Sequence, residues 1–219
     1  MSISFSDYDL LDIINEGHDG CPLCRLEEDR IKSFMKGLLY ESVNKREFRR
    51  DIRFTRICHK HFELFNKATF EDKTLAGLGP AIIFRDMISS QIEEMEKSSF
   101  LGFKKKKDDC YFCTHDTTLP ERINSTGYKI LSTEDGFTAL RNSDMIICLE
   151  HYEALLKLSE KKKDMNFYKK LKEYQLEKYD EMVGKLKLFI DKHDHNDKRQ
   201  IAQEEAFAIK TAFKSLKKR

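Results

Sequence analysis

Four short motifs, which together use every cysteine of this 219-residue chain, constrain its fold more than any other feature. They are Cys21-x-x-Cys24, Cys58-x-x-His61, Cys110-x-x-Cys113 and Cys148-x-x-His151. A Cys-x-x-Cys motif places two thiolates on one tight turn, and a Cys-x-x-His motif places a thiolate and an imidazole on one face of a helical turn. The order is the same twice, so each Cys-x-x-Cys is expected to join the Cys-x-x-His that follows it.

Two structural zinc ions per chain account for all eight residues, because three sulfurs and one nitrogen complete a tetrahedron with no open position. The expected ligands are Cys21, Cys24, Cys58 and His61 at one site, and Cys110, Cys113, Cys148 and His151 at the other. In the second copy only the last position is histidine, which favours His61 over His59 in the first. Disulfides would leave both histidines unexplained. A thioredoxin-like motif would need a βαβ setting that the sequence does not contain.

The spacing between the motifs indicates an internal repeat with helical segments. Phe48 and Phe137 lie at the same offset from the preceding Cys-x-x-Cys, as do the candidate N-cap residues Asn44 and Thr133. Apolar residues recur at spacings of three and four from Leu23 to Val43, and no stretch alternates as a strand does. The sequence therefore predicts a long helix, a short helix with the phenylalanine, and a ligand helix in each copy.

The resulting fold class is all-α: two related helical zinc modules, the second extended by a long C-terminal helical hairpin. We expect a first module at 1–98, a linker at 99–109, a second module at 110–160 and a basic hairpin at 161–219. Within the first module, a helix with Pro80 near its start is expected to bury Ile83, Phe84, Met87, Ile88, Ile92 and Met95. In the hairpin, a helix from Met165 to Ile190 is expected to pack against a last helix.

Charge and composition indicate in which cellular compartment the protein is expected to work. Charged residues make up 36% of the chain, and its net charge is only +2. The charge is unevenly distributed, because residues 157–219 contain 18 Lys or Arg against 11 Asp or Glu. No apolar run approaches the ~18 residues of a membrane span, and the first residues do not resemble a signal peptide. We expect a cytoplasmic protein that does not enter a membrane.

No catalytic constellation is visible, so the chain is not expected to be an enzyme. The leading hypothesis is a binding or scaffold module for a macromolecular partner. One alternative is nucleic-acid binding by the basic third, with Tyr168 or Tyr174 stacking on bases. The candidate phosphate contacts are Lys161, Lys162, Lys163, Lys169, Lys170, Lys172, Lys214, Lys217, Lys218 and Arg219. A second alternative is a thiol-based redox or zinc sensor, in which oxidation of Cys21/Cys24 or Cys110/Cys113 releases zinc.

Several segments together resemble an uncharacterised prokaryotic family, a domain of unknown function with two CPxC…CxxH modules. The matching segments are Cys21-Pro-Leu-Cys24, Leu38–Asn44, Cys58-x-x-His61 and Leu78–Asp86. Tyr111 stands where the family more often has proline. The resemblance implies the same helical, metal-binding organisation and no assigned activity.

Overall fold

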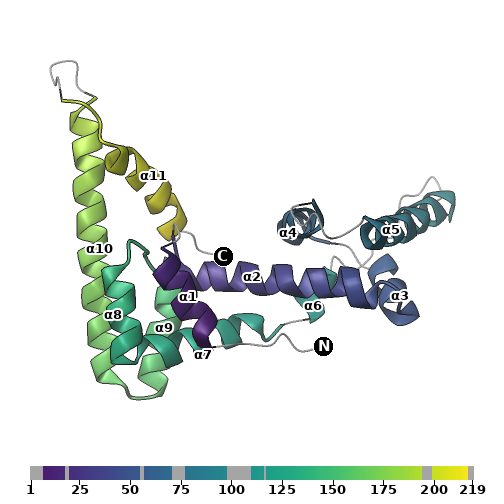
Figure 1. Cartoon of the computed structure of the whole chain (residues 1–219), viewed down its shortest axis with the longest axis horizontal. Coiled ribbons are helices and arrows are strands. Elements are labelled where there is room, and N and C mark those ends of the chain that lie inside the picture. The colour runs from purple at the N-terminus through teal and green to yellow at the C-terminus, as the bar shows by residue number, and fades with distance from the viewer. Residues whose placement is uncertain are drawn as a thin grey trace. The chain divides into compact units, whose positions relative to one another are not determined.

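The computed structural model describes residues 7–17, 20–54, 57–70, 77–97, 110–115, 117–193 and 199–216, and these residues form helices without a β-strand (Figure 1). The all-α prediction is confirmed. The described residues divide into two compact units. Unit 1 contains those of Glu28–Leu119, and unit 2 contains those of Ser4–Glu27 and Pro120–Arg219. The predicted linker at 99–109 lies outside the described residues.

Unit 1 is built around aromatic side chains. Its helical elements are the π-helical turn η1 (Leu38–Ser42), α3 (Arg46–Phe54), α4 (His59–Phe70), α5 (Leu78–Lys97) and α6 (Tyr111–His115), with the end of α2 (Pro22–Gly37). The ring of Phe112 lies edge-on to Phe34, at 6.2 Å between centroids, and 6.0 Å from Phe65. Tyr111 begins α6 and packs against Phe48. Both residues inside the Cys110-x-x-Cys113 motif are therefore core residues of unit 1.

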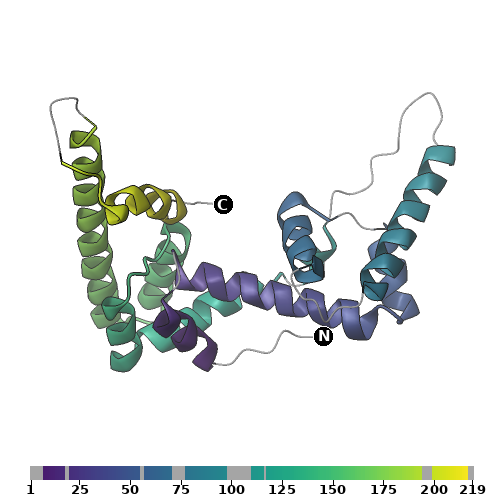
Figure 2. The same ribbon diagram turned by 45° about the horizontal axis from the view of Figure 1, so that its top comes forward.

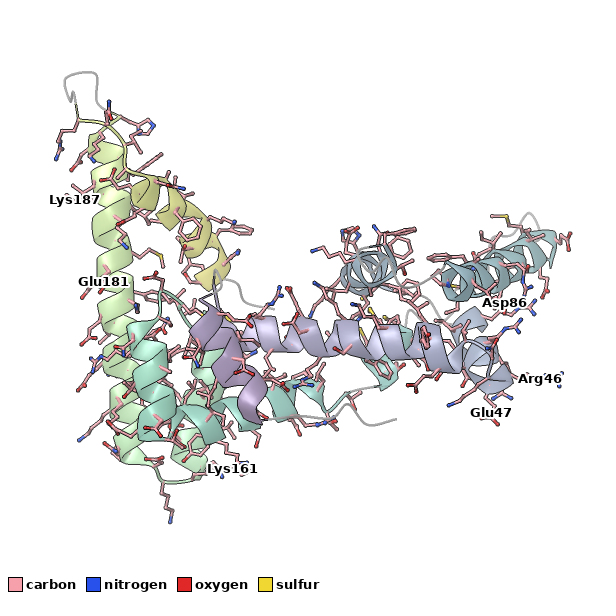
Figure 3. All side chains as sticks on the ribbon, in the orientation of Figure 1. Arg46, Glu47, Asp86, Lys161, Glu181 and Lys187 are labelled. Atoms are coloured by element: carbon pink, nitrogen blue, oxygen red, sulfur yellow. The ribbon has the colours of Figure 1, made fainter. Side chains whose placement is uncertain are left out.

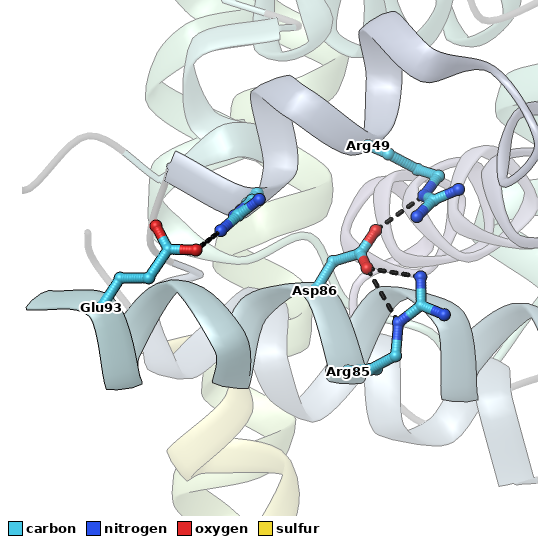
Figure 4. Close-up of polar contacts among 5 residues, drawn as sticks. Arg49, Arg85, Asp86 and Glu93 are labelled. Atoms are coloured by element: carbon cyan, nitrogen blue, oxygen red, sulfur yellow. Dashed lines mark hydrogen bonds and ion pairs between the residues drawn. The ribbon is translucent and has the colours of Figure 1, made fainter.

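Ion pairs join α3 to α5 (Figure 4). Arg49 Nε donates to Asp86 at 2.6 Å, Arg85 donates to the other oxygen of Asp86 at 2.7 Å, and Arg53 pairs with Glu93. The hydrogen bond from Arg49 holds the pKa of Asp86 below its ordinary value. The ion pairs between the two helices determine which face of α5 packs against α3.

The prediction for α5 is confirmed at Ile83, which is buried, and wrong at Ile88, Ile92 and Met95, which are exposed. The buried residues of this helix include Ile83 and Ser90. The ionic partners of α3 lie at Asp86 and Glu93, so these positions of α5 face α3, whereas Ile88, Ile92 and Met95 face outward.

Unit 2 contains α1 (Asp7–Glu16), the start of α2, and four further helices before the last one. These are α7 (Leu119–Leu131, from Pro120 onward), α8 (Glu134–Asn142), α9 (Leu149–Lys161) and α10 (Met165–Asp191). Thr133 is the N-cap of α8 and accepts a hydrogen bond from the Gly136 N–H, as predicted. Phe137 of α8 packs edge-on against Phe167 and Tyr174 of α10.

The predicted C-terminal hairpin is present as α10 and α11 (Gln203–Ser215); α11 begins beside α10, contacts it and slants away from it (Figures 1 and 2). Lys192 closes it: its ammonium donates to both carboxylate oxygens of Glu205, at 2.6 and 2.9 Å, and to the Gln200 carbonyl. Glu205 in turn accepts from the Ala202 N–H. Charged side chains such as Glu181 and Lys187 project along α10 (Figure 3).

No helix in the described part of the chain is both long enough and apolar enough to cross a membrane.

Candidate metal centres

Every motif begins at the start of a helix. The first cysteine directly precedes α2, α4, α6 or α9, and its carbonyl accepts a first-turn hydrogen bond; these cysteines are Cys21, Cys58, Cys110 and Cys148. The second candidate ligand follows three residues later, one turn into the helix. Unsatisfied N–H groups and the positive end of the helix dipole stabilise a thiolate at such a position. The local sequence therefore brings two candidate ligands to one side of each helix start.

The four motifs meet in two clusters, each within one unit. In unit 2 the cluster is Cys21, Cys24, Cys148 and His151, and in unit 1 it is Cys58, His61, Cys110 and Cys113. In each cluster, one ligand atom from every residue lies within 4.8 Å of all the others. His61, rather than His59, is the histidine in its cluster. Each set of three thiols and one imidazole could hold a metal ion.

The predicted pairing of the motifs is wrong. The first Cys-x-x-Cys meets the second Cys-x-x-His, and the second Cys-x-x-Cys meets the first Cys-x-x-His. The expectation that residues 1–98 and residues 110–160 each contain all four ligands of one site therefore does not hold. Helix α2 separates Cys24 from Gly37 by ~20 Å, at ~1.5 Å of rise per residue, so motifs that follow each other in the sequence need not be neighbours in space.

In unit 2 the sulfurs surround the imidazole closely. His151 Nδ1 lies 3.2 Å from Cys148 Sγ, 3.4 Å from Cys24 Sγ and 3.6 Å from Cys21 Sγ. The sulfurs of Cys24 and Cys148 are 3.6 Å apart, so they are not bonded to each other. Cys24 is partly exposed, and the other three residues are buried.

Helix α10 donates hydrogen bonds to the backbone of the segment that directly precedes Cys148. The hydroxyl of Tyr174 donates to the Met145 carbonyl at 2.6 Å, and the amide of Gln175 donates to the Ile147 carbonyl at 2.9 Å. The same segment also bonds to the first Cys-x-x-Cys motif, because the Ile146 N–H donates to the carbonyl of Gly20, the residue before Cys21. Gly20 has a φ of +96°, which a side chain would strain. The two halves of this cluster are therefore tied together by backbone as well as by the candidate ligands.

The unit 1 cluster has similar dimensions. His61 Nδ1 lies 3.3 Å from Cys58 Sγ and from Cys110 Sγ, and 3.4 Å from Cys113 Sγ. The sulfurs of Cys58 and Cys113 are 3.9 Å apart. The His61 ring packs 5.6 Å from the Phe112 ring, which joins the cluster to the aromatic core. The unit 1 cluster is more exposed to solvent than the unit 2 cluster, because Cys113 is exposed and Cys58 is partly exposed.

In both clusters, burial and the closeness of the thiols shift the pKa values of the candidate ligands. Burial raises the pKa of Cys21 well above its ordinary value, and the sulfurs of Cys148 and Cys24 raise it further. Burial and Coulombic repulsion from Cys110 raise the pKa of Cys113 to about 12. Burial alone would lower the pKa of His151, but interactions with Cys148 and Cys24 outweigh it and raise the pKa to about 9. A divalent cation would offset the repulsion that opposes full deprotonation.

The residues suggested for nucleic-acid contact have mixed surroundings. Lys161, Lys162, Lys163, Lys169 and Lys172 are exposed, whereas Lys170 pairs with Glu134 at 2.7 Å. Lys217, Lys218 and Arg219 lie outside the described residues. The suggestion that Tyr174 is available for stacking is wrong, because Tyr174 is fully buried.

Sequence reasoning missed the residues that support the unit 2 cluster. Tyr174 and Gln175 lie on the buried face of α10, about 28 residues beyond the backbone groups they bind. The one local signal was Gly20 directly before Cys21, since glycine at such a position indicates an unusual backbone conformation.

Comparisons with known proteins found similar sequences whose descriptions give no activity. A family model described as "Family of unknown function (DUF6062)" matches residues 1–219. The chain is also similar to the "Uncharacterized 23.9 kDa protein in xynA 3'region" of Caldicellulosiruptor sp. (strain Rt8B.4), at 26% identity over 188 residues. That match covers 84% of this chain and 88% of the relative. No solved structure matches the chain.

Proposed function

The chain belongs to the DUF6062 family along its whole length, and from this premise we propose a non-enzymatic protein that two structural zinc ions stabilise and whose C-terminal hairpin binds a protein partner. The proposal has two parts, the identity of the metal and the role of the hairpin, and each part has its own test.

The observation that supports zinc most directly is the spacing of the donor atoms. Zinc bonds of about 2.3 Å to sulfur and 2.0–2.1 Å to nitrogen give tetrahedron edges of about 3.8 Å between sulfurs and about 3.6 Å between sulfur and nitrogen. The sulfurs of Cys24 and Cys148 are 3.6 Å apart, those of Cys58 and Cys113 are 3.9 Å apart, and the distances from each histidine Nδ1 to the sulfurs of its cluster are 3.2 to 3.6 Å. Three soft thiolates and an imidazole also suit zinc better than a hard cation such as magnesium.

A structural role follows from where the ligands lie in the chain. The unit 2 ligands come from both of its segments, so a bound ion would connect Ser4–Glu27 to Pro120–Arg219. Zinc binding in small structural modules contributes about 10–16 kcal/mol. A typical domain is stable by only about 5–15 kcal/mol. Metal binding would therefore decide whether each unit folds.

Metal analysis tests this part of the proposal. Protein purified without added metal should contain two zinc ions per chain by elemental analysis. Chelation should lower the thermal midpoint and the helical circular dichroism, and added zinc should restore both. Protein that contains no zinc, or that keeps its thermal midpoint after complete chelation, would contradict the proposal.

The hairpin supports a binding role through exposed apolar side chains. Val183 and Ile190 are exposed on α10, and Phe213 of α11 is 82% exposed. Contiguous exposed apolar patches mark sites of protein association, and the proposal takes these three side chains as parts of one such patch. Lys and Glu residues interleaved along α10 would form the polar rim of such a site.

A triple variant, Val183→Ser/Ile190→Ser/Phe213→Ser, tests the binding role. Partners crosslinked to the wild-type chain in cells should be lost from this variant, while its zinc content and circular dichroism stay unchanged. Met165→Ser is the matched control, because Met165 is also exposed on α10 but lies at its opposite end. If the triple variant keeps the same crosslinks as the control, the hairpin is not the binding surface.

Nucleic-acid binding has less support as an alternative. It would rest on the exposed lysines at Lys161–Lys163, but acidic residues are interleaved with the lysines of α10, and Tyr174 cannot stack. Phosphate contacts make affinity fall steeply with salt. A protein that makes 6–10 phosphate contacts typically loses affinity by a factor of about 10³–10⁵ between 50 and 200 mM salt. Binding to a single-stranded oligonucleotide that weakens more than tenfold over this range would favour the alternative.

A further inference from the structure

We infer that the unit 1 cluster is a site of reversible oxidation, in which a hydroperoxide converts Cys113 and Cys58 to a disulfide, while the unit 2 cluster resists the same oxidant. The inference rests on the proposed zinc binding and assigns the two sites different roles. It also selects one of the two Cys-x-x-Cys motifs and names a different disulfide partner from the one that sequence proximity suggests.

The first observation is the difference in access to the sulfurs. Cys113 is exposed, whereas the most accessible sulfur of the unit 2 cluster, that of Cys24, belongs to a residue that is only partly exposed. Cys21 and Cys148 are buried. An oxidant from solution must reach a sulfur atom before it can react, and cysteine oxidation follows both thiolate character and exposure. In the zinc-loaded protein every cysteine ligand is a thiolate, so exposure decides among them. Cys113 is therefore the expected first point of attack.

The second observation is the position of a partner sulfur. Cys58 Sγ lies 3.9 Å from Cys113 Sγ, and Cys58 precedes α4 rather than lying inside a helix. A disulfide bond is about 2.05 Å long, so the two sulfurs must approach each other by about 2 Å.

The third observation is that the equivalent movement is opposed in unit 2. Cys148 is the sulfur 3.6 Å from Cys24. The backbone before Cys148 is held by hydrogen bonds from Tyr174 and Gln175 and by the bond from Ile146 to Gly20. Moving this sulfur would strain or break bonds to buried groups, which costs free energy.

The chemistry balances with a hydroperoxide as the only co-reactant. The thiolate of Cys113 attacks one peroxide oxygen, so that a sulfur–oxygen bond forms and the oxygen–oxygen bond breaks, and hydroxide leaves and is protonated to water. The thiolate of Cys58 then attacks Cys113 Sγ, a disulfide forms, and the sulfur–oxygen bond breaks with loss of a second hydroxide. Two thiols are oxidised by two electrons and hydrogen peroxide is reduced to two waters. A cluster with one thiolate and one imidazole left no longer offers a closed zinc site.

The experiment treats the zinc-loaded full chain with hydrogen peroxide and follows zinc release with a chromogenic chelator. We expect one zinc per chain to leave at least about fivefold faster than the other. Mass spectrometry of alkylated peptides should show a Cys58–Cys113 disulfide at that stage, and thiol reductant with zinc should reverse it. Release of both ions at one rate, release of neither, or a first disulfide that contains Cys24 would overturn the inference.

Two matched variants separate the sites. Cys113→His keeps a zinc-binding atom but removes the exposed sulfur, and it should slow the first release at least about fivefold. Cys24→His, the equivalent change in unit 2, should leave the first release unchanged; equal effects of the two variants would contradict the inference. If Cys113→His does not fold, peptide mapping of the wild type still decides. Protein purified without zinc would instead contradict the proposed function, so the two failures are distinguishable.

Discussion

Tyr174, in the middle of α10, donates a 2.6 Å hydrogen bond to the carbonyl of Met145, three residues before Cys148. The side chain is fully buried, so no solvent replaces this bond if it is lost. The longest helix of unit 2 therefore positions the candidate metal ligand through backbone contacts, without contributing a ligand itself.

Tyr174→Phe removes the donor and leaves the Met145 carbonyl buried without it. We expect a loss of about 1–2 kcal/mol in the free energy of unfolding by urea, the usual effect of an unsatisfied buried group. Zinc affinity at one of the two sites should fall as well, because the segment that carries Cys148 is less constrained. Tyr168→Phe, a partly exposed tyrosine of the same helix, is the control. Equal effects of the two substitutions would show that the hydrogen bond does not matter.

Much of the local structure follows from the sequence, for identifiable reasons. The periodic apolar residues of α2 and α10 and the N-cap at Thr133 act over one or two turns, so short-range rules predict them. Helix α1 was not predicted, since its ten residues lie outside the repeated pattern.

The grouping of the ligands could not be predicted in the same way. Each motif determines its own pair of ligands through the geometry of a helix start, but which pairs meet depends on the direction of α2 and α3 over tens of ångströms. Two copies of the same motif are chemically equivalent partners, so composition and spacing favour neither arrangement. The outward face of α5 was missed for a related reason, because Asp86 and Glu93 take the face that pairs with α3.

Thr133→Ala should destabilise unit 2 by about 1 kcal/mol, because the Gly136 N–H loses its side-chain acceptor at the start of α8. Ser132→Ala is a suitable control, since Ser132 is exposed and its hydroxyl lies 3.4 Å from the Lys129 carbonyl. Chemical denaturation monitored by circular dichroism compares the two. A Thr133→Ala variant as stable as Ser132→Ala would mean that the cap does not stabilise the helix.

The hairpin should show a specific dependence on pH. The hydrogen bond from Lys192, followed by the bond from the Ala202 N–H, lowers the pKa of Glu205. A lowered carboxyl pKa stabilises the fold above the unfolded value of about 4.3, and this contribution is lost as the pH falls through the folded value. Glu205→Gln should therefore have a lower thermal midpoint than wild type at pH 7, and the difference should narrow below pH ~4.

Thermal melts of both proteins between pH 7 and pH 3 provide this comparison. Glu204→Gln, at the neighbouring exposed position, should have a midpoint close to wild type throughout. A difference between Glu205→Gln and wild type that stays constant across the whole range would contradict the assigned ion pair.

The most direct test of the crossed arrangement is the zinc content of two double variants. Cys24→Ser/Cys148→Ser removes two ligands from one cluster, and Cys24→Ser/Cys58→Ser removes one ligand from each. With zinc bound as proposed, the crossed grouping predicts one zinc per chain in the first variant and none in the second. One zinc in Cys24→Ser/Cys58→Ser and none in Cys24→Ser/Cys148→Ser would contradict it, because that result requires each Cys-x-x-Cys to share a zinc with the Cys-x-x-His that follows it in sequence.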